Sequence, residues 1–460
     1  MSGTRASAVA EAERFFDEGE FLAGLARLVA APTQSQLPGA GPALRAYFAD
    51  HIIPSLDDAG FACEILDNPE SAAGPLLFAH RHEGADLPTV LIYGHGDVVA
   101  GQDEHWRSGL SPWTLTVDGD HLYGRGTADN KGQHWINISA LRTVIAERGS
   151  LGFNCKILLE SDEEMGSRGL RAFCAQERER LAADVLIASD GPRLDPERAT
   201  VVLGSRGLVN FELSLKLREG AHHSGNWGGL IGDPGIILAH AIASLTDARG
   251  QIAVPEWRPT SLTDEVRALL AEIKVSGGPN APAIDADWGE EGLTPEERVY
   301  GWNSFAVLAL ELGDPARPQN AIQPAARAVC QLRYVVGTDP DDVLPALRRH
   351  LDARGFGNVA IVPTRMAMQA TRLDADDPWA QLALKSLGRT LDRPAALVPN
   401  IGGSIPNDIF AGLLGLSTVW VPHSYAGCAQ HAPNEHMLAS VAREGLQIMT
   451  GLFWDIGAGK

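Results

Sequence analysis

Residues 89–97, TVLIYGHGD, decide the fold class of this 460-residue chain. Five strand-forming residues run directly into a glycine, His95 and Asp97. Such a run, closed by glycine and polar residues, is typical of a buried strand. The pattern recurs at 157–164 (ILLESDEE), 185–191 (VLIASDG) and 418–423 (TVWVPH). Each predicted strand therefore ends in side chains that can do chemistry.

Helical patterns lie between these strands, at 133–148 and 167–181. This alternation predicts an α/β fold in which a mixed, largely parallel sheet is covered by helices. Ligands of such sheets bind beyond the carboxyl ends of the strands. The acids and histidines stand at those ends, so the sequence predicts a functional site there.

The middle of the chain has a different pattern, with predicted strands at 208–217 and 328–335 and predicted helices at 234–245 and 342–354. We interpret residues 205–365 as an inserted α+β domain, with a loop at 276–283. The catalytic domain is then discontinuous, formed by residues 1–204 and 366–460.

The N-terminal 32 residues read as one acidic amphipathic helix rather than an export signal, because no basic start precedes an apolar block. Its candidate core residues are Phe15, Phe16, Phe21, Leu22, Leu25 and Leu28.

Composition excludes several classes of protein. The chain is 45% hydrophobic, which rules out a disordered protein, and no apolar run reaches the roughly 18 residues of a membrane span. Its 38 basic and 58 acidic residues give a net charge of −20, which disfavours nucleic acid and anionic membranes as partners. Five scattered cysteines without a CxxC pair fit a reducing cytoplasm.

The polar residues at and near the strand ends are of metal-ligating types. They are His95, Asp129, Glu163, Glu164, Asp190 and His431. Imidazoles together with carboxylates suit zinc, cobalt or manganese. No cysteine lies among them, which argues against a closed structural zinc site and for an open catalytic one. Five ligands, one of them a bridging carboxylate, would suffice for two metal ions.

Five motifs, in order along the chain, carry a resemblance to a known family. They are GHGDVV (94–99), GRGTADNKG (124–132), ESDEEMGS (160–167), ASDGP (188–192) and QHAPNEH (430–436). Together they resemble the M20 family of dinuclear metallopeptidases, which includes carnosinase-like dipeptidases, succinyl-diaminopimelate desuccinylase, aminoacylase and glutamate carboxypeptidase. The resemblance implies a catalytic domain with an inserted lid/dimerisation domain, and a homodimer.

The resemblance also implies a role for each candidate ligand. His95 and Asp190 would bind one metal ion, Glu164 and His431 the other, and Asp129 would bridge the two. Zinc is the first expectation for both ions, with manganese or cobalt as alternatives.

Two further carboxylates have implied roles in the same centre. Glu163 would be the general base that takes a proton from a metal-activated bridging water. Asp97 would orient the ring of His95. The peptide bond Asp129–Asn130 matches one that is cis in the family. Gly96 replaces a larger residue there, so we expect looser packing around it.

The inserted domain and a late loop supply the residues implied in substrate binding. His223, in GAHHSG (220–225), would reach the substrate carbonyl in the neighbouring subunit of a dimer. Arg333 would bind the substrate carboxylate as a planar guanidinium. Ser404 and Gly403, in the GGSIP loop (402–406), would contact the substrate by side chain and backbone.

The sequence thus predicts a metal-dependent hydrolase that cleaves a peptide or amide bond in a small substrate. In the family that the sequence resembles, dipeptidase and aminopeptidase-like members tend to have aspartate at the position of Asp190, so the resemblance favours dipeptides with a free amine. An N-acyl or N-carbamoyl amino-acid amidohydrolase stays an alternative, because the same centre attacks any such carbonyl. A non-catalytic binding protein of the same shape is disfavoured, because all the positions of the centre are filled.

Overall fold

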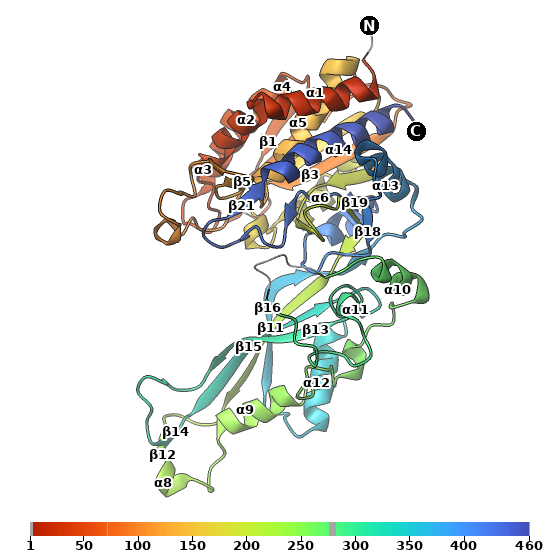
Figure 1. Cartoon of the computed structure of the whole chain (residues 1–460). Helices are drawn as coiled ribbons and strands as arrows, with labels where there is room; N and C mark the ends of the chain where they lie inside the picture. Colours follow the sequence, from red (N-terminus) through yellow and green to blue (C-terminus); the bar gives the residue numbers. More distant parts are fainter. Residues whose placement is uncertain (1–2, 71, 276–281, 460) are drawn as a thin grey trace.

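The computed structural model describes residues 3–70, 72–275 and 282–459. Two sheets dominate it. Figure 1 shows a large sheet layered with helices, which holds both chain termini, and a smaller sheet that extends away from it. The second sheet is formed by the middle of the chain.

The large sheet has the strand order β1-β2-β6-β3-β7-β19-β9-β18. Its strands are β1 (Ala62–Leu66), β2 (Leu76–Arg81), β3 (Thr89–His95), β6 (Asn154–Glu160), β7 (Val185–Ala188), β9 (Thr200–Val202), β18 (Ala396–Val398) and β19 (Ser417–Trp420). The central neighbours β6, β3, β7 and β19 are mutually parallel, and β1 and β2 join antiparallel. The predicted mixed, largely parallel sheet is confirmed.

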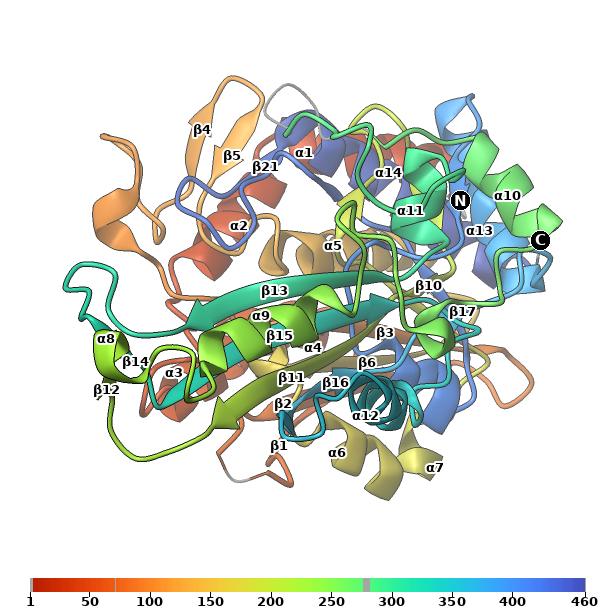
Figure 2. The same ribbon diagram turned by 90° about the horizontal axis from the view of Figure 1, so that it is seen from below.

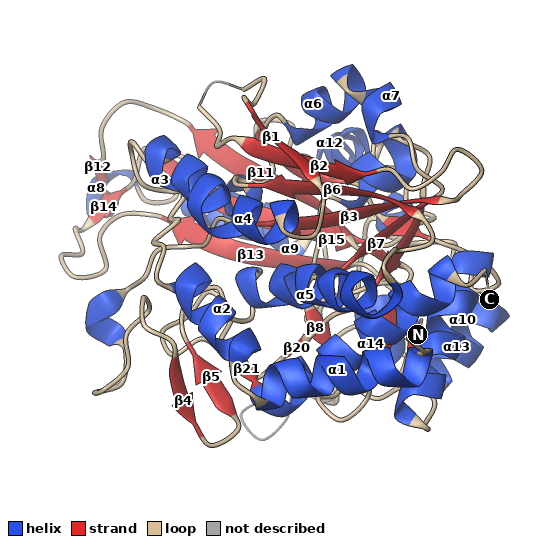
Figure 3. Cartoon of the chain, turned by 90° about the horizontal axis from the view of Figure 1, so that it is seen from above, coloured by secondary structure: helices blue, strands red, loops and turns tan. Residues whose placement is uncertain are grey.

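Both faces of this sheet are buried, as the continuous apolar runs require. Val90 and Ile92 of β3 face one core cluster, whereas Leu91 and Tyr93 face the other. Figure 3 shows helices over the first face. They include α1 (Arg5–Asp17), α2 (Glu20–Val29), α5 (Lys131–Arg148) and α14 (Ala439–Gly457). Helix α6 (Leu170–Gln176) covers the second face, where its Phe173 belongs to the same core cluster as Leu91 and Tyr93.

The lid sheet is antiparallel throughout, with the order β13-β15-β11-β16. Its strands are β11 (Gly207–Lys216), β13 (Ser304–Glu311), β15 (Ala325–Tyr334) and β16 (Ala360–Met368). Helices α9 (Pro234–Ala243) and α12 (Val343–Ala353) cover one face (Figure 2), and Leu238, Leu347 and Phe211 pack together there. This α+β unit is the inserted domain that the sequence predicts; its boundaries at 204/205 and 365/366 stay predictions.

One segment of the insertion packs on the large-sheet side instead. Helices α10 (Asp264–Ala271) and α11 (Pro295–Tyr300) are in contact with each other. Val266 and Leu270 of α10 belong to the core cluster that contains Phe173. The insertion is therefore anchored on the catalytic core as well as on its own core. Most of the predicted loop 276–283 lies outside the described residues.

The prediction of a single N-terminal helix is wrong. The chain forms two helices, α1 and α2, because Gly19 adopts a left-handed conformation (φ 84°) that ends the first and begins the second. Phe21, Leu25 and Leu28 are buried, whereas Phe15, Phe16 and Leu22 are partly buried against the same core. Among the described residues, no helix is long and apolar enough to span a membrane.

Candidate metal centre and active site

Three neighbouring parallel strands deliver the first candidate ligands to one edge of the large sheet. His95 is the last residue of β3, and Asp190 follows β7 by two residues. Glu163 and Glu164 begin a short 3-10 turn, η3 (Glu163–Met165), just after β6. Because β6, β3 and β7 are adjacent and parallel, their carboxyl ends meet.

Two residues from elsewhere complete the cluster. Asp129 directly precedes Asn130, the N-cap of helix α5. His431 lies in the loop between β20 (Ser424–Tyr425) and β21 (His436–Leu438). The peptide bond Asp129–Asn130 is cis, as the resemblance implied, and the Asn130 amide donates to the carbonyl of Ser189 at 2.8 Å.

Five of the six residues form two candidate metal-binding groups that share Asp129. One is His95, Asp129 and Asp190, and the other is Asp129, Glu164 and His431; within each group the ligand atoms lie within 4.8 Å of one another. Asp129 Oδ1 lies 3.0 Å from His95 Nε2, and its Oδ2 lies 3.0 Å from His431 Nε2. One carboxylate therefore faces both groups, each with a different oxygen.

The charges of this cluster suit a cation. Burial raises the pKa of Glu164 to about 7 and that of Asp190 to about 6, with the carboxylate of Asp129 adding repulsion. Glu164 Oε1 is buried and has no hydrogen-bond partner in the described part of the chain. Hydrogen bonds to Asp129 and Glu164 raise the pKa of His431 to about 11. In the metal-free protein a proton on the imidazole thus supplies positive charge that a divalent ion would otherwise bring.

Glu163 belongs to neither group but lies beside the first. Its Oε2 lies 4.0 Å from His95 Nε2, and it lines the same cavity as the candidate ligands. Burial raises the pKa of this carboxyl well above its ordinary value. A carboxylate next to, but outside, a metal centre is free to accept a proton.

Asp97 connects the histidine to the pair of glutamates. It is fully buried, and its Oδ1 lies 3.4 Å from His95 Nδ1. Its two oxygens also accept hydrogen bonds from the backbone N–H groups of Glu163 (3.2 Å) and Glu164 (3.1 Å). These two backbone hydrogen bonds were not predicted from sequence, and they fix η3 relative to β3.

Sequence reasoning missed Glu435 altogether. This buried carboxylate accepts hydrogen bonds at Oε1 from the backbone N–H groups of Gly126, Ala128 and Asp129 at 3.0–3.1 Å. Its Oε2 accepts one from Arg125 at 2.8 Å. Glu435 therefore holds the loop that presents Asp129. Its position four residues after His431 was the only available signal, and an acid in a polar loop is usually solvated.

The expected loose packing around Gly96 is wrong. A Cβ atom at this position would lie 2.6 Å from the Tyr47 ring and 3.2 Å from that of Phe48. Two aromatic side chains thus occupy the space that a larger residue would take. The glycine is required by this packing.

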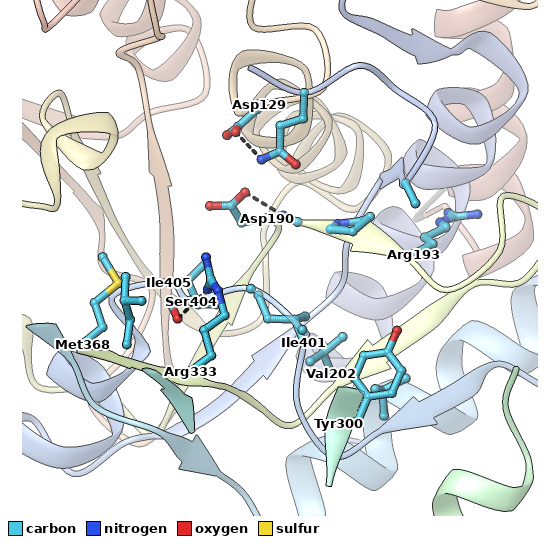
Figure 4. Close-up of a pocket in the computed structure, with 18 of the residues that line it drawn as sticks. Asp129, Asp190, Arg193, Val202, Tyr300, Arg333, Met368, Ile401, Ser404 and Ile405 are labelled. Atoms are coloured by element: carbon cyan, nitrogen blue, oxygen red, sulfur yellow. Dashed lines mark hydrogen bonds between the residues drawn. The ribbon is translucent and has the colours of Figure 1, made fainter. Parts of the chain in front are cut away.

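A cavity of about 430 Å³ opens in front of the candidate ligands. Arg333 of β15 and Ser404 reach it from the lid and from the loop after β18, and the guanidinium donates to Ser404 Oγ at 3.2 Å. Figure 4 shows this pair on the cavity wall, below Asp190. Gly403 lines the same wall. The structure thus brings together three of the four residues that the resemblance implied in substrate binding.

His223 is not brought to this cavity in the single chain. It lies in β12 (His222–His223), which pairs with β14 (Ala321–Ile322), and its side chain is exposed. Figure 1 places β12 and β14 at the end of the lid that is remote from the large sheet. Among the described cavity-lining residues, His223 is absent.

Comparison with known proteins decides the family. The model of peptidase family M20/M25/M40 matches residues 91–455. The chain belongs to peptidase family M20/M25/M40. It is therefore a metal-dependent hydrolase of peptide or amide bonds, and its catalytic domain and inserted lid are those of the M20 fold.

Relatives within the M20 family show what this chain is similar to. It is 35% identical to the Beta-Ala-His dipeptidase of Mus musculus over 398 residues, which cover 83% of this chain and 80% of the relative. The structure of an M20 family metallo-carboxypeptidase from Sulfolobus solfataricus superposes with a TM-score of 0.81 at 23% identity, over 95% of this chain and 99% of that one. For human carnosine dipeptidase 1 the TM-score is 0.76 at 23% identity, with 98% and 100% covered.

Proposed function

We propose that this M20 enzyme hydrolyses the amide bond of a small substrate that ends in a free carboxylate, in the manner of a dipeptidase. One observation carries the proposal. Asp129 belongs to two metal-binding groups at the wall of a cavity that also holds Arg333, an arginine without an acidic partner among the described residues. Dipeptidases among the relatives, such as the Beta-Ala-His dipeptidase, support it.

The donor set fits two divalent ions, with zinc as the first candidate. His95, Asp129 and Asp190 would hold one ion, and Asp129, Glu164 and His431 the other, because imidazole and carboxylate ligands suit zinc as well as manganese and cobalt. When bound, such ions polarise the substrate carbonyl and lower the pKa of a water molecule.

The chain's own residues then orient the substrate and move the proton. Arg333 and Ser404 would bind the terminal carboxylate, since a guanidinium matches a carboxylate in shape and charge. Glu163 would accept the proton of the attacking water and deliver it to the leaving nitrogen. Asp97 would hold Glu163 in place by accepting a hydrogen bond from its backbone N–H, and Glu435 would hold Asp129 in the same way.

A homodimer completes this proposed site. Strand β13 is an edge strand of the lid sheet, and Val307, Leu308 and Leu310 on it are 43%, 53% and 62% exposed. An exposed apolar edge strand is a template for pairing with another chain. A two-fold pair through this edge would bring the partner's remote lid tip, with His223, to the opposite active site. There the imidazole would stabilise the negative charge that develops on the carbonyl oxygen.

The alternative substrates, N-acyl or N-carbamoyl amino acids, share the same carboxylate and the same scissile bond. We also propose a cytoplasmic location, supported by five free cysteines, four of them buried.

The test is a substrate panel. The protein is stripped with a chelator, reloaded with zinc, manganese or cobalt, and assayed with dipeptides, N-acyl amino acids and the same compounds capped as carboxamides. We expect metal-dependent hydrolysis of the free carboxylates. Equal hydrolysis of the carboxamides would overturn the role of Arg333, and an inactive panel would overturn the proposed function.

A further inference from the structure

The far wall of the cavity is apolar. Figure 4 shows Arg333 and Ser404 on one side of Ile401, and Val202 and Tyr300 on the other. Val398 also lines the cavity and is paired with Val202 across β18 and β9, so it belongs to this second side, which we call the Tyr300 arm. Val202 and Val398 are about 1% exposed and belong to the core cluster beneath the cavity, with Tyr300 packed against it.

No charged side chain is directed into this arm among the described lining residues. The acids of the cavity are Asp129, Glu163, Glu164 and Asp190, which belong to the metal-binding groups or, in the case of Glu163, lie beside them. Arg193 lines the cavity, but its guanidinium is turned away to the Glu444 carboxylate at 2.6 Å and the Pro422 carbonyl at 3.1 Å. A charged or amine-bearing group placed in the arm would lose its hydration without a partner.

Helix α11 is fixed where it closes the arm. Thr294 and Glu297 form a capping box at its start, and the Glu297 carboxylate also pairs with Arg267 of α10. Gly402 lets the helix lie close, because a Cβ atom there would be 3.2 Å from Val299. The arm is thus a built wall rather than a gap between loops.

From this we infer that the Tyr300 arm binds the acyl chain, or the N-terminal side chain, of the substrate and that this chain is uncharged and apolar. The inference rests on the proposed function: with the carboxylate-bearing half held at Arg333 and the carbonyl at the metal centre, the acyl half extends away from Arg333. Substrates with an apolar acyl group or an apolar N-terminal residue are therefore preferred over those with a polar one.

The test varies one half of the substrate at a time. N-acyl alanines with acetyl, butanoyl and hexanoyl groups, and Leu-Ala, Ser-Ala and Asp-Ala, vary the acyl half; N-acetyl amino acids vary the other. We expect kcat/KM to rise about fourfold per added methylene of the acyl group, the factor that burial of one CH₂ implies. We expect a weaker dependence on the C-terminal side chain. Preference for Ser-Ala or Asp-Ala over Leu-Ala would overturn the inference.

Variants locate the preference. Val202→Thr and Val398→Thr keep the side-chain volume but add a hydroxyl, so each should weaken the dependence of kcat/KM on acyl length. Tyr300→Ala should weaken it too, because it removes the ring. Tyr300→Phe keeps the ring and should not. Val362→Thr, at a lid position that is 48% exposed, is the control. Calorimetry with the Glu163→Gln variant measures the affinity of the same series for the arm in the absence of hydrolysis. An unchanged series in all three arm variants would overturn the assignment, whereas loss of hydrolysis with intact binding would overturn only the proposed function.

A second observation, independent of the arm, concerns Arg206. Its side chain is 5% exposed and donates to the Arg333 carbonyl at 3.1 Å and to Ser304 Oγ at 2.6 Å. Its backbone N–H donates to the Gly403 carbonyl at 3.2 Å. One residue therefore contacts both the strand that carries Arg333 and the loop that carries Ser404.

We propose that Arg206 is a positioning residue for carboxylate recognition. Among the described residues, neither Arg206 nor Arg333 forms an ion pair with an acid, although the chain carries a net charge of −20. Two uncompensated guanidinium groups make this end of the cavity attractive to an anion. Burial, and then repulsion from Arg333, lower the pKa of Arg206 to about 10, which leaves it charged at neutral pH.

The test distinguishes a role of Arg206 in positioning the carboxylate-binding residues from a role in folding alone. Arg206→Met should raise KM for carboxylate substrates at least tenfold while kcat and metal content stay, and Arg206→Lys should recover part of the loss. KM for carboxamide-capped substrates should not change. Arg327→Met, an exposed arginine on the same strand as Arg333, is the control. Equal rises for carboxylate and carboxamide, or loss of fold in both Arg206 variants, would assign Arg206 a structural role and overturn the proposal.

Discussion

The carboxylate of Glu435 holds Asp129 by its backbone: Glu435 Oε1 accepts the Asp129 N–H at 3.1 Å. Asp129 can then offer one oxygen to each metal-binding group. Supporting residues of this kind change metal affinity by roughly 10- to 100-fold. We expect Glu435→Gln to weaken metal binding within that range, as measured by competition with a chelating dye, because the amide keeps one acceptor but loses the charge opposite Arg125. An affinity equal to that of the wild type would contradict this role.

Glu163 and Glu164 are neighbours with different expected roles. Glu163→Gln keeps the shape of the side chain but removes the proton acceptor, so we expect kcat to fall at least ~100-fold with metal content unchanged. Glu164→Ala should lose metal as well as activity. Metal analysis and kinetics on both variants separate the two roles, and the opposite pattern would show that they are exchanged.

The proposed dimer predicts that two inactive variants complement each other. His223→Ala and Glu163→Gln should each be inactive as pure dimers. After subunit exchange, one of the two sites in a mixed dimer would combine an intact Glu163 with the partner's intact histidine. We expect recovered activity in proportion to the mixed species. A mixture with proven exchange that stays inactive would exclude action across subunits.

The buried carboxyl of Glu160 predicts a pH-dependent stability. Tyr93 and Ser167 donate to its Oε1 at 2.6 and 2.9 Å, and its Oε2 has no partner among the residues that the structure describes. Burial raises its pKa from 4.5 to about 8. The folded state therefore binds this proton more tightly than the unfolded state. Its contribution is present below pH 4.5 and is lost as the pH rises to about 8.

Urea unfolding of the metal-free protein between pH 5 and 8 measures this loss. Glu160→Gln keeps the Oε1 acceptor and cannot ionise, so its free energy of unfolding should fall less with rising pH than that of the wild type. Identical pH slopes for the two proteins would show that Glu160 does not contribute.

The strand-end residues could be predicted because adjacent parallel strands end at one edge of a sheet. His95 ends a strand and Asp190 follows one closely, whereas Asp129 and His431 lie in loops. All four were candidates from their residue types, and the family motifs supplied the role expected of each. The role of Glu435 could not be predicted, nor could the hydrogen bonds of Asp97 to the backbone of Glu163 and Glu164. Both carboxylates accept from backbone N–H groups that only the folded loops bring near. The break at Gly19 was missed because the apolar period continues across it. The anchoring of α10 on the catalytic core is a tertiary choice that local patterns do not encode.

The central claim is that Asp129 joins two metal ions into one hydrolytic centre. The most direct test is a calorimetric titration of the metal-stripped protein with zinc, with hydrolysis of a dipeptide followed in the same samples, for the wild type and for Asp129→Asn. We predict two ions per wild-type chain, activity that returns as they bind, and loss of both in the variant. Full activity in the metal-free protein, or in Asp129→Asn, would contradict the account.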